Sequence, residues 1–200
     1  MKSGQFNEFC DFLEVLTKKI NMFFENQKEY IHCKEGCSLC CRQGEYPCSE
    51  LEYEFLRLGV ALLPVETQKQ ITQKVLKIKE DKKYSSPGIP FEYECPFLFD
   101  NKCSIYKYRM IICRTFGLPY YINQDGEQRI KTPFCVHHGL NYSEVYDAER
   151  NTISQELFEQ KGYQNEPVAF NLSLSFILNK LGKESMGLDF GEEKSLIDWL

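Results

Sequence analysis

Eight of the ten cysteines in this 200-residue chain are gathered in two sets, one within nine residues and one spread over the segment 95–135. These eight residues are Cys33, Cys37, Cys40, Cys41, Cys95, Cys103, Cys113 and Cys135. Thiolates are strong ligands for zinc and for iron–sulfur clusters. A lone thiol often serves as a small apolar core residue, but packing does not explain eight thiols at this density. We therefore predict that all eight cysteines ligate a metal ion or a cluster.

A disulfide scaffold is a weaker explanation for these cysteines. Ten cysteines in 200 residues amount to 5%, below the roughly 8–10% that marks a short disulfide-rich chain. Acidic residues at Glu8, Asp11 and Glu14 interrupt the apolar segment that a signal peptide requires. No stretch reaches the roughly 18 apolar residues of a membrane span. We expect a cytoplasmic protein, in which thiols stay reduced.

The overall charge does not indicate a nucleic-acid-binding protein. The net charge is −5, and the isoelectric point is about 5.4, so a generally basic surface is not expected. Hydrophobic residues make up 42% of the chain and charged residues 26%, which is typical of a globular protein. The expected partner is therefore a metal ion or cluster. Membrane binding is not expected, and a protein partner is neither predicted nor excluded by the sequence.

Apolar periodicity predicts three helices in the first half of the chain. The first spans 6–28 and places Phe6, Phe9, Leu13, Leu16, Ile20 and Phe23 on one face. A second helix begins after Ser49, because Ser49 and Glu52 have the spacing of a capping box, and its expected buried face comprises Leu51, Phe55, Leu58 and Leu62. A third helix begins near Pro64, buries Ile71, Val75 and Ile78, and ends before the break at 85–88.

Turn signals predict two hairpins, and the remaining periodicity predicts further helices. One hairpin surrounds Asp100-Asn101-Lys102 and the other surrounds Asp125-Gly126. Segments 143–161 and 167–181 read as helices that stop at Gly162 and Gly182. The acidic tail from 186 to 200 either docks as a helix or frays. The expected class is α+β, mainly α-helical, with a helix at 1–28, a cysteine-cluster domain at 29–140 and C-terminal helices at 141–200 that pack on the same domain.

The motifs around the cysteines resemble those of the YkgJ-type cysteine-cluster family over about residues 30–137. The resemblance is carried by the run from Cys33 to Cys41, Cys95-Pro96-Phe97-Leu98, Cys103-Ser104-Ile105-Tyr106, Arg109 and Cys113-Arg114. That family is described as a zinc- or iron-chelating domain or as an iron–sulfur protein. The resemblance implies metal binding, with redox or methyl-transfer chemistry, since a flagellin lysine methylase shares the cysteine domain. The chain departs from the family pattern at Met110 and Gly117, where proline is usual.

Several residues near the cysteines have competing interpretations. His32, His137 and His138 could each replace a thiolate or adjust a bound metal, although a histidine is more often an ordinary packing or surface residue. Arg109 and Arg114 flank Cys113 and could offset the negative charge of the thiolates, or form surface ion pairs. Cys10 is most simply a core residue, and Cys48 a structural one. The sequence does not decide among these interpretations.

Three functional hypotheses follow from the sequence. The first is an iron–sulfur cluster, expected to be of the 4Fe–4S type and with or without a second metal, that has a redox or group-transfer role. The second is a zinc-stabilised binding module without catalysis, and the third is metal delivery or sensing. The spacing from Cys33 to Cys40 also matches a radical-SAM triad, but the strand–helix alternation of that fold is not visible. No catalytic residue is identified.

Overall fold

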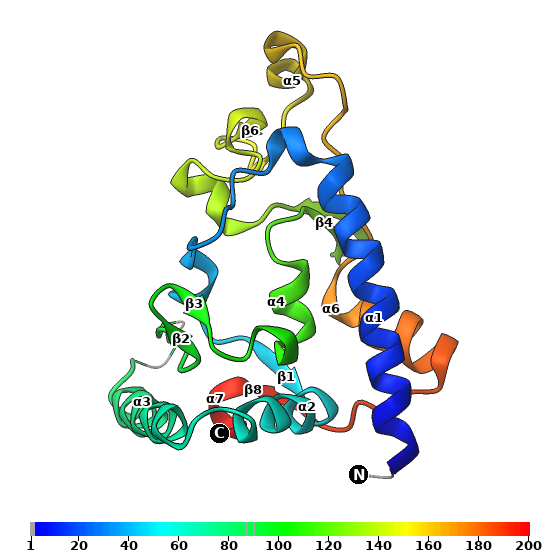
Figure 1. Ribbon diagram of the computed structural model, residues 1–200. Coiled ribbons are helices and arrows are strands. Elements are labelled where there is room, and N and C mark those ends of the chain that lie inside the picture. The colour runs from blue at the N-terminus through cyan, green and yellow to red at the C-terminus, as the bar shows by residue number, and fades with distance from the viewer. Residues whose placement is uncertain (1–2, 87, 90) are drawn as a thin grey trace. The chain divides into compact units, whose positions relative to one another are not determined.

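The computed structural model describes residues 3–86, 88–89 and 91–200, and the chain forms two compact units (Figure 1). The first unit comprises Met1–Lys34 and Arg114–Leu188, and the second comprises Glu35–Cys113 and Asp189–Leu200. Helices dominate both units, and the strands form short antiparallel pairs. The predicted α+β class with mainly α-helical content is therefore confirmed. No helix in the described part of the chain combines the length and apolar character needed to cross a membrane.

The first unit is built on helix α1 (Ser3–Asn26), which is followed by the 3-10 turn η1 (Lys28–Tyr30). Phe9, Leu13, Leu16 and Ile20 are buried, as the periodicity predicted. A second buried cluster lies beyond the end of α1 and contains Tyr30, Val136, Tyr142 and Val145. Its members come from segments that are separated by more than a hundred residues, so this cluster joins the two parts of the first unit.

The hairpin predicted around Asp125-Gly126 is present in the first unit. Strand β4 (Tyr120–Gln124) pairs with β5 (Glu127–Lys131), and the two turn residues have φ angles of 55° and 82°. Such positive φ values at both central positions are the requirement of a tight hairpin turn. Asp-Gly satisfies it because aspartate tolerates the left-handed region and glycine has no Cβ.

The helix predicted for 143–161 is wrong over most of its length. The segment begins with the 3-10 turn η5 (Ser143–Val145), continues as the hairpin β6 (Tyr146–Asp147) and β7 (Thr152–Ile153), and ends in α5 (Gln155–Lys161). The Asp147 side chain accepts backbone N–H bonds from Glu149 and Arg150, at 2.9 and 3.0 Å. A local side-chain bond of this kind competes with helix formation. The predicted stop at Gly162 is confirmed by its left-handed conformation.

The helix predicted for 167–181 is also partly wrong. Phe170 lies in extended backbone beside β4, because its N–H donates to Pro119 and its carbonyl accepts from Tyr121, both at 3.0 Å. The helical segment begins only after Ser173, as α6 (Leu174–Phe176), and continues as the π-helix η6 (Ile177–Glu184). Gly182 is buried inside that π-helix and does not end it.

The second unit contains helices α2 (Glu50–Ala61) and α3 (Val65–Lys83), together with the short strands β1 (Pro47–Ser49) and β8 (Glu193–Ser195), which pair with each other. The capping box of Ser49 and Glu52 and the start after Pro64 are confirmed. The end of α3 at Lys83 precedes the predicted break, of which Pro87 lies outside the described residues. The tail docks through β8 and α7 (Leu196–Trp199), with Leu196 and Ile197 buried.

The buried face of α2 differs from the prediction. Leu51 and Phe55 are buried, but Leu58 and Leu62 are exposed, and Leu56 is buried instead. Gly59 on this helix lies against the Tyr108 side chain. A Cβ at this glycine would stand 2.6 Å from the Tyr108 side chain, so only glycine permits the contact.

The remaining elements of the second unit are small and carry most of the cysteines. The 3-10 turn η2 (Leu39–Cys41) lies in the first cysteine set, and the predicted hairpin around Asp100-Asn101 consists of β2 (Leu98–Phe99) and β3 (Lys102–Cys103). A further 3-10 turn, η3 (Tyr106–Tyr108), precedes the short helix α4 (Ile111–Thr115). These loops pack on a buried apolar cluster that includes Leu56, Phe97 and Ile105.

Candidate metal centre

The predicted ligands are divided between the two units. Cys33 and Cys135 belong to the first unit, and the other six belong to the second. Four of those six influence one another electrostatically and form a group that we call the cysteine tetrad. The tetrad consists of Cys41, Cys95, Cys103 and Cys113.

The backbone joins the two cysteine sets directly at the tetrad. The N–H of Cys95 donates a hydrogen bond of 2.7 Å to the carbonyl of Cys41. The N–H of Leu98 then donates to the carbonyl of Cys95 at 3.0 Å, which turns the chain into hairpin β2–β3. In that hairpin Leu98 pairs with Cys103. Residues more than fifty positions apart are thereby fixed beside one another.

Burial and mutual repulsion dominate the electrostatics of the tetrad. Burial, together with smaller contributions from negative charge on Cys41 and Cys103, raises the pKa of the Cys113 thiol to about 12. Burial likewise raises the pKa of Cys95 well above its usual range, with Cys113 as the next contributor. Each thiol therefore makes ionisation of its neighbours harder, which is the situation that a bound cation relieves.

Cys41 is the exception, because its pKa is lowered to about 7. A hydrogen bond with the Cys40 side chain is the largest cause, and the guanidinium groups of Arg109 and Arg42 add to it against the opposing effect of burial. Arg109 lies over the Tyr106 ring at 3.9 Å and also lowers the pKa values of Cys103 and Cys113. It thus has the position predicted for a residue that offsets thiolate charge. The guanidinium of Arg114, in contrast, donates to Thr17 in the first unit at 3.1 Å.

The tetrad fits a thiophilic metal or cluster in its donor chemistry and surroundings. Three of its thiols, those of Cys95, Cys103 and Cys113, pack against the buried apolar cluster of the second unit. Within residues 3–86, 88–89 and 91–200, no three Cys, His, Asp or Glu side chains lie close enough together to hold one metal ion. The sulfurs are therefore gathered in one region without forming the tight shell of a single ion.

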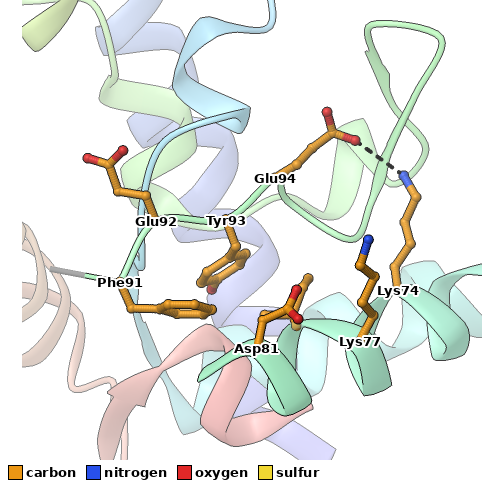
Figure 2. Close-up of a pocket in the computed structure, with 8 residues that line it drawn as sticks. Lys74, Lys77, Asp81, Phe91, Glu92, Tyr93 and Glu94 are labelled. Carbon is orange, nitrogen blue, oxygen red and sulfur yellow. Dashed lines mark ion pairs between the residues drawn. The ribbon is translucent and has the colours of Figure 1, made fainter. Parts of the chain in front are cut away.

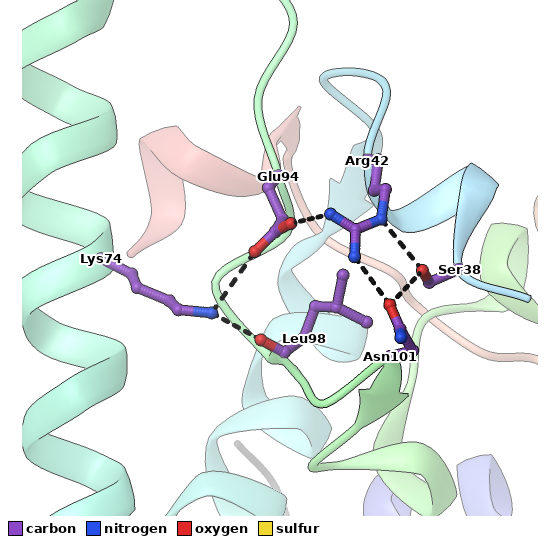
Figure 3. A network of polar contacts seen from close by, with 6 residues as sticks. All are labelled: Ser38, Arg42, Lys74, Glu94, Leu98 and Asn101. Atoms are coloured by element: carbon purple, nitrogen blue, oxygen red, sulfur yellow. Dashed lines mark hydrogen bonds and ion pairs between the residues drawn. The ribbon is translucent and has the colours of Figure 1, made fainter. Parts of the chain in front are cut away.

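An arginine that the sequence analysis did not single out connects the segments of the tetrad (Figure 3). Arg42 follows Cys41, and its guanidinium contacts Ser38 at 3.1 Å, Asn101 at 2.7 Å and the carboxylate of Glu94. Glu94 also pairs with Lys74 of α3 at 3.6 Å. The sequence offered one signal for this network, since Arg42 and Glu94 each stand directly beside a predicted ligand.

A second residue missed by sequence reasoning is Glu52. Its side chain was recognised only as part of the capping box of α2, yet it is buried and also accepts the N–H of Ile111 at 2.7 Å. Ile111 begins α4, which carries Cys113. No local pattern reports this contact, because it joins residues that are 59 positions apart.

In the first unit, a buried asparagine fixes the backbone at Cys33. The Asn141 side chain accepts the N–H groups of His32 and Cys33, both at 2.9 Å, and donates to the carbonyl of Gly117 at 3.0 Å. Asn141 follows Cys135 by six residues, so Cys33 and Cys135 belong to segments that meet at one side chain. Cys33 itself is exposed, whereas Cys135 is buried.

The three histidines have ordinary contacts in the first unit. His32 faces Glu144 at 3.4 Å, with both side chains about 40% exposed. The ring of His137 packs edge-on against Tyr146, and that of His138 packs edge-on against Phe134. These contacts favour the interpretation of the histidines as packing and surface residues.

Cys48 and Cys10 are the two cysteines outside the predicted ligand set. Cys48 is fully buried in the core of the second unit, and its carbonyl accepts a hydrogen bond of 2.7 Å from the Trp199 indole. Burial raises the pKa of its thiol, as expected of a structural cysteine. Cys10 on α1 is only partly buried, so it is less buried than the prediction of a core residue implies.

A pocket of about 360 Å³ opens in the second unit between α3 and the segment that leads to Cys95 (Figure 2). Lys74, Lys77 and Asp81 face it from α3, and the rings of Phe91 and Tyr93 point toward that helix. Glu94 is shared between the pocket and the Arg42 network. The lining of the pocket contains charges of both signs, so the charge of the pocket does not indicate the class of ligand.

Comparison with known families adds one finding. The family model CxxCxxCC, described as "Putative zinc- or iron-chelating domain", matches residues 32–136, which is more than half of the chain and contains all eight predicted ligands. No curated protein and no solved structure matches the chain.

Proposed function

Because the chain belongs to the CxxCxxCC family of zinc- or iron-chelating domains, we propose that its cysteine tetrad holds an iron–sulfur cluster. The observation that carries this proposal is the direct backbone bond from Cys95 to Cys41, which joins the two cysteine sets in one unit. The other predicted ligands, Cys33, Cys37, Cys40 and Cys135, keep their predicted role in metal binding and are not assigned to a particular metal. The cluster would supply electron transfer or an electrophilic iron for group transfer.

The positive charges around the tetrad would compensate the negative charge of a metal or cluster ligated by several thiolates. Four thiolates on a dication leave a net charge near −2, and cationic side chains nearby reduce the free energy of that charge. Arg109 and Arg42 both act on the tetrad in this sense. Arginine stays protonated throughout the physiological range, so this compensation does not depend on pH.

The surroundings of the tetrad would affect the reduction potential of a bound cluster. The reduction potential of a cluster depends on burial and on hydrogen bonds near its sulfurs. The Tyr46 ring packs against the apolar cluster of the second unit, and its hydroxyl donates to the carbonyl of Cys40 at 2.7 Å. Burial raises the pKa of Tyr46, and negative charge on four cysteines adds to the increase, so this hydroxyl stays protonated beside the centre.

The alternative is a zinc-stabilised module without catalysis. The observation that favours it is the tight turn after Cys95, in which Leu98 N–H donates to the Cys95 carbonyl and the hairpin then returns to Cys103. Cysteine-bearing turns of this kind are common around structural zinc. In that case the metal would chiefly stabilise the fold of the second unit.

The experiment that decides between the two is elemental analysis of protein purified without oxygen. Iron with an equal amount of acid-labile sulfide, together with visible absorption, is the expected result. Zinc without sulfide in a colourless, air-stable protein would overturn the cluster and support the zinc module. Absence of both metals from protein reconstituted with iron, sulfide or zinc would overturn metal binding by the tetrad itself.

A further inference from the structure

Three segments that bear tetrad cysteines meet at one side chain, that of Arg42. Its Nε donates to Ser38 of the first cysteine loop at 3.1 Å, and one terminal nitrogen donates to Asn101 in the turn between β2 and β3 at 2.7 Å. The other terminal nitrogen donates to the carboxylate of Glu94 (Figure 3). The Ser38 hydroxyl also donates to Asn101 at 3.2 Å, which closes the network on itself.

Each contact of Arg42 stands close in sequence to a different cysteine. Arg42 directly follows Cys41, Glu94 directly precedes Cys95, and Asn101 lies two residues before Cys103. The planar guanidinium has several donors in a fixed arrangement, so it can hold three partners at once in a way that lysine cannot. Arg42 therefore constrains the relative positions of three of the four tetrad residues.

The network is anchored on α3, and its Arg42–Glu94 ion pair is accessible to solvent, whereas Ser38 is buried. Lys74 pairs with Glu94 at 3.6 Å and also donates to the carbonyl of Leu98 in the hairpin. The Arg42 and Glu94 side chains are 47% and 43% exposed. Exposed ion pairs are screened by salt and open readily, whereas buried ones do not. The Arg42–Glu94 pair can therefore open without unfolding of the apolar core.

We propose that Arg42 is a positioning residue whose contacts act as a latch on the metal centre, and that opening of this latch sets the rate at which the centre releases its metal. The inference rests on the proposed function, since it concerns the same cysteine tetrad. Release requires the ligand-bearing segments to separate, and the Arg42 contacts oppose that separation for Cys41, Cys95 and Cys103. Cys113 is held independently, through α4 and Glu52.

The test follows transfer of metal from the protein, as purified without oxygen, to an excess of a chromophoric chelator. Arg42→Gln is expected to release its metal about 10- to 100-fold faster than the wild type, the range seen when a residue that supports metal ligands is removed. Release from the wild type should accelerate as ionic strength rises from about 0.01 M to about 1 M, because the Debye length then falls from about 30 Å to about 3 Å. Release from Arg42→Gln should lose most of this salt dependence.

Two further variants separate the latch from a general effect of charge or folding. Arg57→Gln is the matched control, because Arg57 is also an exposed arginine of the second unit in an ion pair, with Glu54 at 3.0 Å; its release should equal that of the wild type. Arg42→Lys keeps a cation beside Glu94 but cannot hold Ser38 and Asn101, so its release rate should be intermediate. If Arg42→Gln does not fold, Glu94→Gln replaces it and should show the same loss of salt dependence.

The outcomes distinguish this inference from the proposed function. A wild-type protein that holds no metal would overturn the proposed function and the latch with it. A wild-type protein that holds metal, and whose rate and salt dependence of release are matched within twofold by Arg42→Gln or by its substitute Glu94→Gln, would overturn the latch alone. Equal acceleration in Arg57→Gln would also overturn it, since surface charge would then explain the effect.

Discussion

The Glu52 carboxylate accepts a hydrogen bond of 2.7 Å from the backbone N–H of Ile111, although the two residues lie on different helices. The same carboxylate accepts the N–H of Ser49 at 3.1 Å and its hydroxyl at 2.7 Å. One buried side chain thus closes the N-terminal ends of both α2 and α4. Because α4 carries Cys113, the position of this predicted ligand depends on a residue of α2.

Replacement of Glu52 by alanine should lower the free energy of unfolding of the second unit by about 2–4 kcal/mol. The variant leaves the N–H of Ile111 and that of Ser49 buried without their acceptor, and unsatisfied buried donors are strongly destabilising. Urea denaturation followed by fluorescence of Trp199, the single tryptophan, measures the change. Glu54→Ala is the control on the same helix, because Glu54 forms only an exposed pair with Arg57. A difference below about 0.5 kcal/mol between the two variants would contradict the role of Glu52.

The ionisation of Glu52 also predicts a dependence of stability on pH. Burial raises the pKa of its carboxyl above the usual value of 4.5, so the folded protein binds this proton more tightly than the unfolded chain does. The stability that the protonated Glu52 carboxyl contributes is therefore fully present below about pH 4.5, and it is lost as pH rises through the raised pKa. Urea denaturation of wild type and Glu52→Gln over this range should show the wild type losing stability relative to the variant as pH increases. The opposite trend would show that the hydrogen bonds to the carboxylate outweigh burial.

Asn141 should be equally important for the first unit. Asn141→Ala removes the acceptor of the His32 and Cys33 N–H groups and the donor to Gly117, all within a fully buried site. We expect faster amide hydrogen exchange at 30–34 and 139–146, equivalent to a local destabilisation of about 2–3 kcal/mol. Asn123→Ala is the control, because Asn123 is an exposed residue of β4 in the same unit and lies outside both windows. Unchanged exchange at residues 32 and 33 in the Asn141 variant would refute the prediction.

The sequence predicted those elements whose signals are local. The capping box of Ser49 and Glu52, the Asp125-Gly126 turn and the apolar stripe of α1 each involve residues a few positions apart, and each is confirmed. The helix predicted for 143–161 failed although its periodicity was suitable, because the Asp147 side chain forms a competing turn. A local pattern that has two physical solutions does not identify the one that the surrounding structure selects.

The candidate site divides in the same way. Clustering identified the cysteines as candidate ligands, but the gathering of the tetrad depends on the contact from Cys95 to Cys41 across more than fifty residues. Arg42 and Glu52 were not identified, because their partners Glu94 and Ile111 are 52 and 59 positions away. Contacts of that kind leave no periodic trace in one sequence. The division of the other four cysteines among metals stays a prediction.

The C-terminal segment should protect the second unit through Trp199. The indole donates to the Cys48 carbonyl at 2.7 Å and stacks on the Tyr53 ring at 5.1 Å. Trp199→Ala should lower the free energy of unfolding by about 2–3 kcal/mol, at the low end for a tryptophan because the side chain is only partly buried. Circular dichroism replaces fluorescence as the probe, and Cys48 should become reactive toward a thiol reagent. Trp199→Phe keeps the aromatic stack, so its free energy of unfolding should lie between those of the wild type and Trp199→Ala. A Cys48 that stays unreactive in Trp199→Ala would refute the protective role.

Single cysteine substitutions should separate the tetrad from the structural cysteines. Cys103→Ser removes a tetrad thiol of strand β3, where the hydroxyl fits the same space but is a poor ligand for iron or zinc. We expect the metal content per chain to fall to less than about half of the wild-type value, with any visible absorption reduced in proportion. Cys10→Ser lies in the first unit on α1 and should retain the full metal content.

Cys48→Ala tests the distinction more closely, because Cys48 packs in the same apolar cluster as Cys95 and Cys103. It should lower stability but leave the metal content per folded chain unchanged, whereas a loss of metal equal to that of Cys103→Ser would place Cys48 among the ligands.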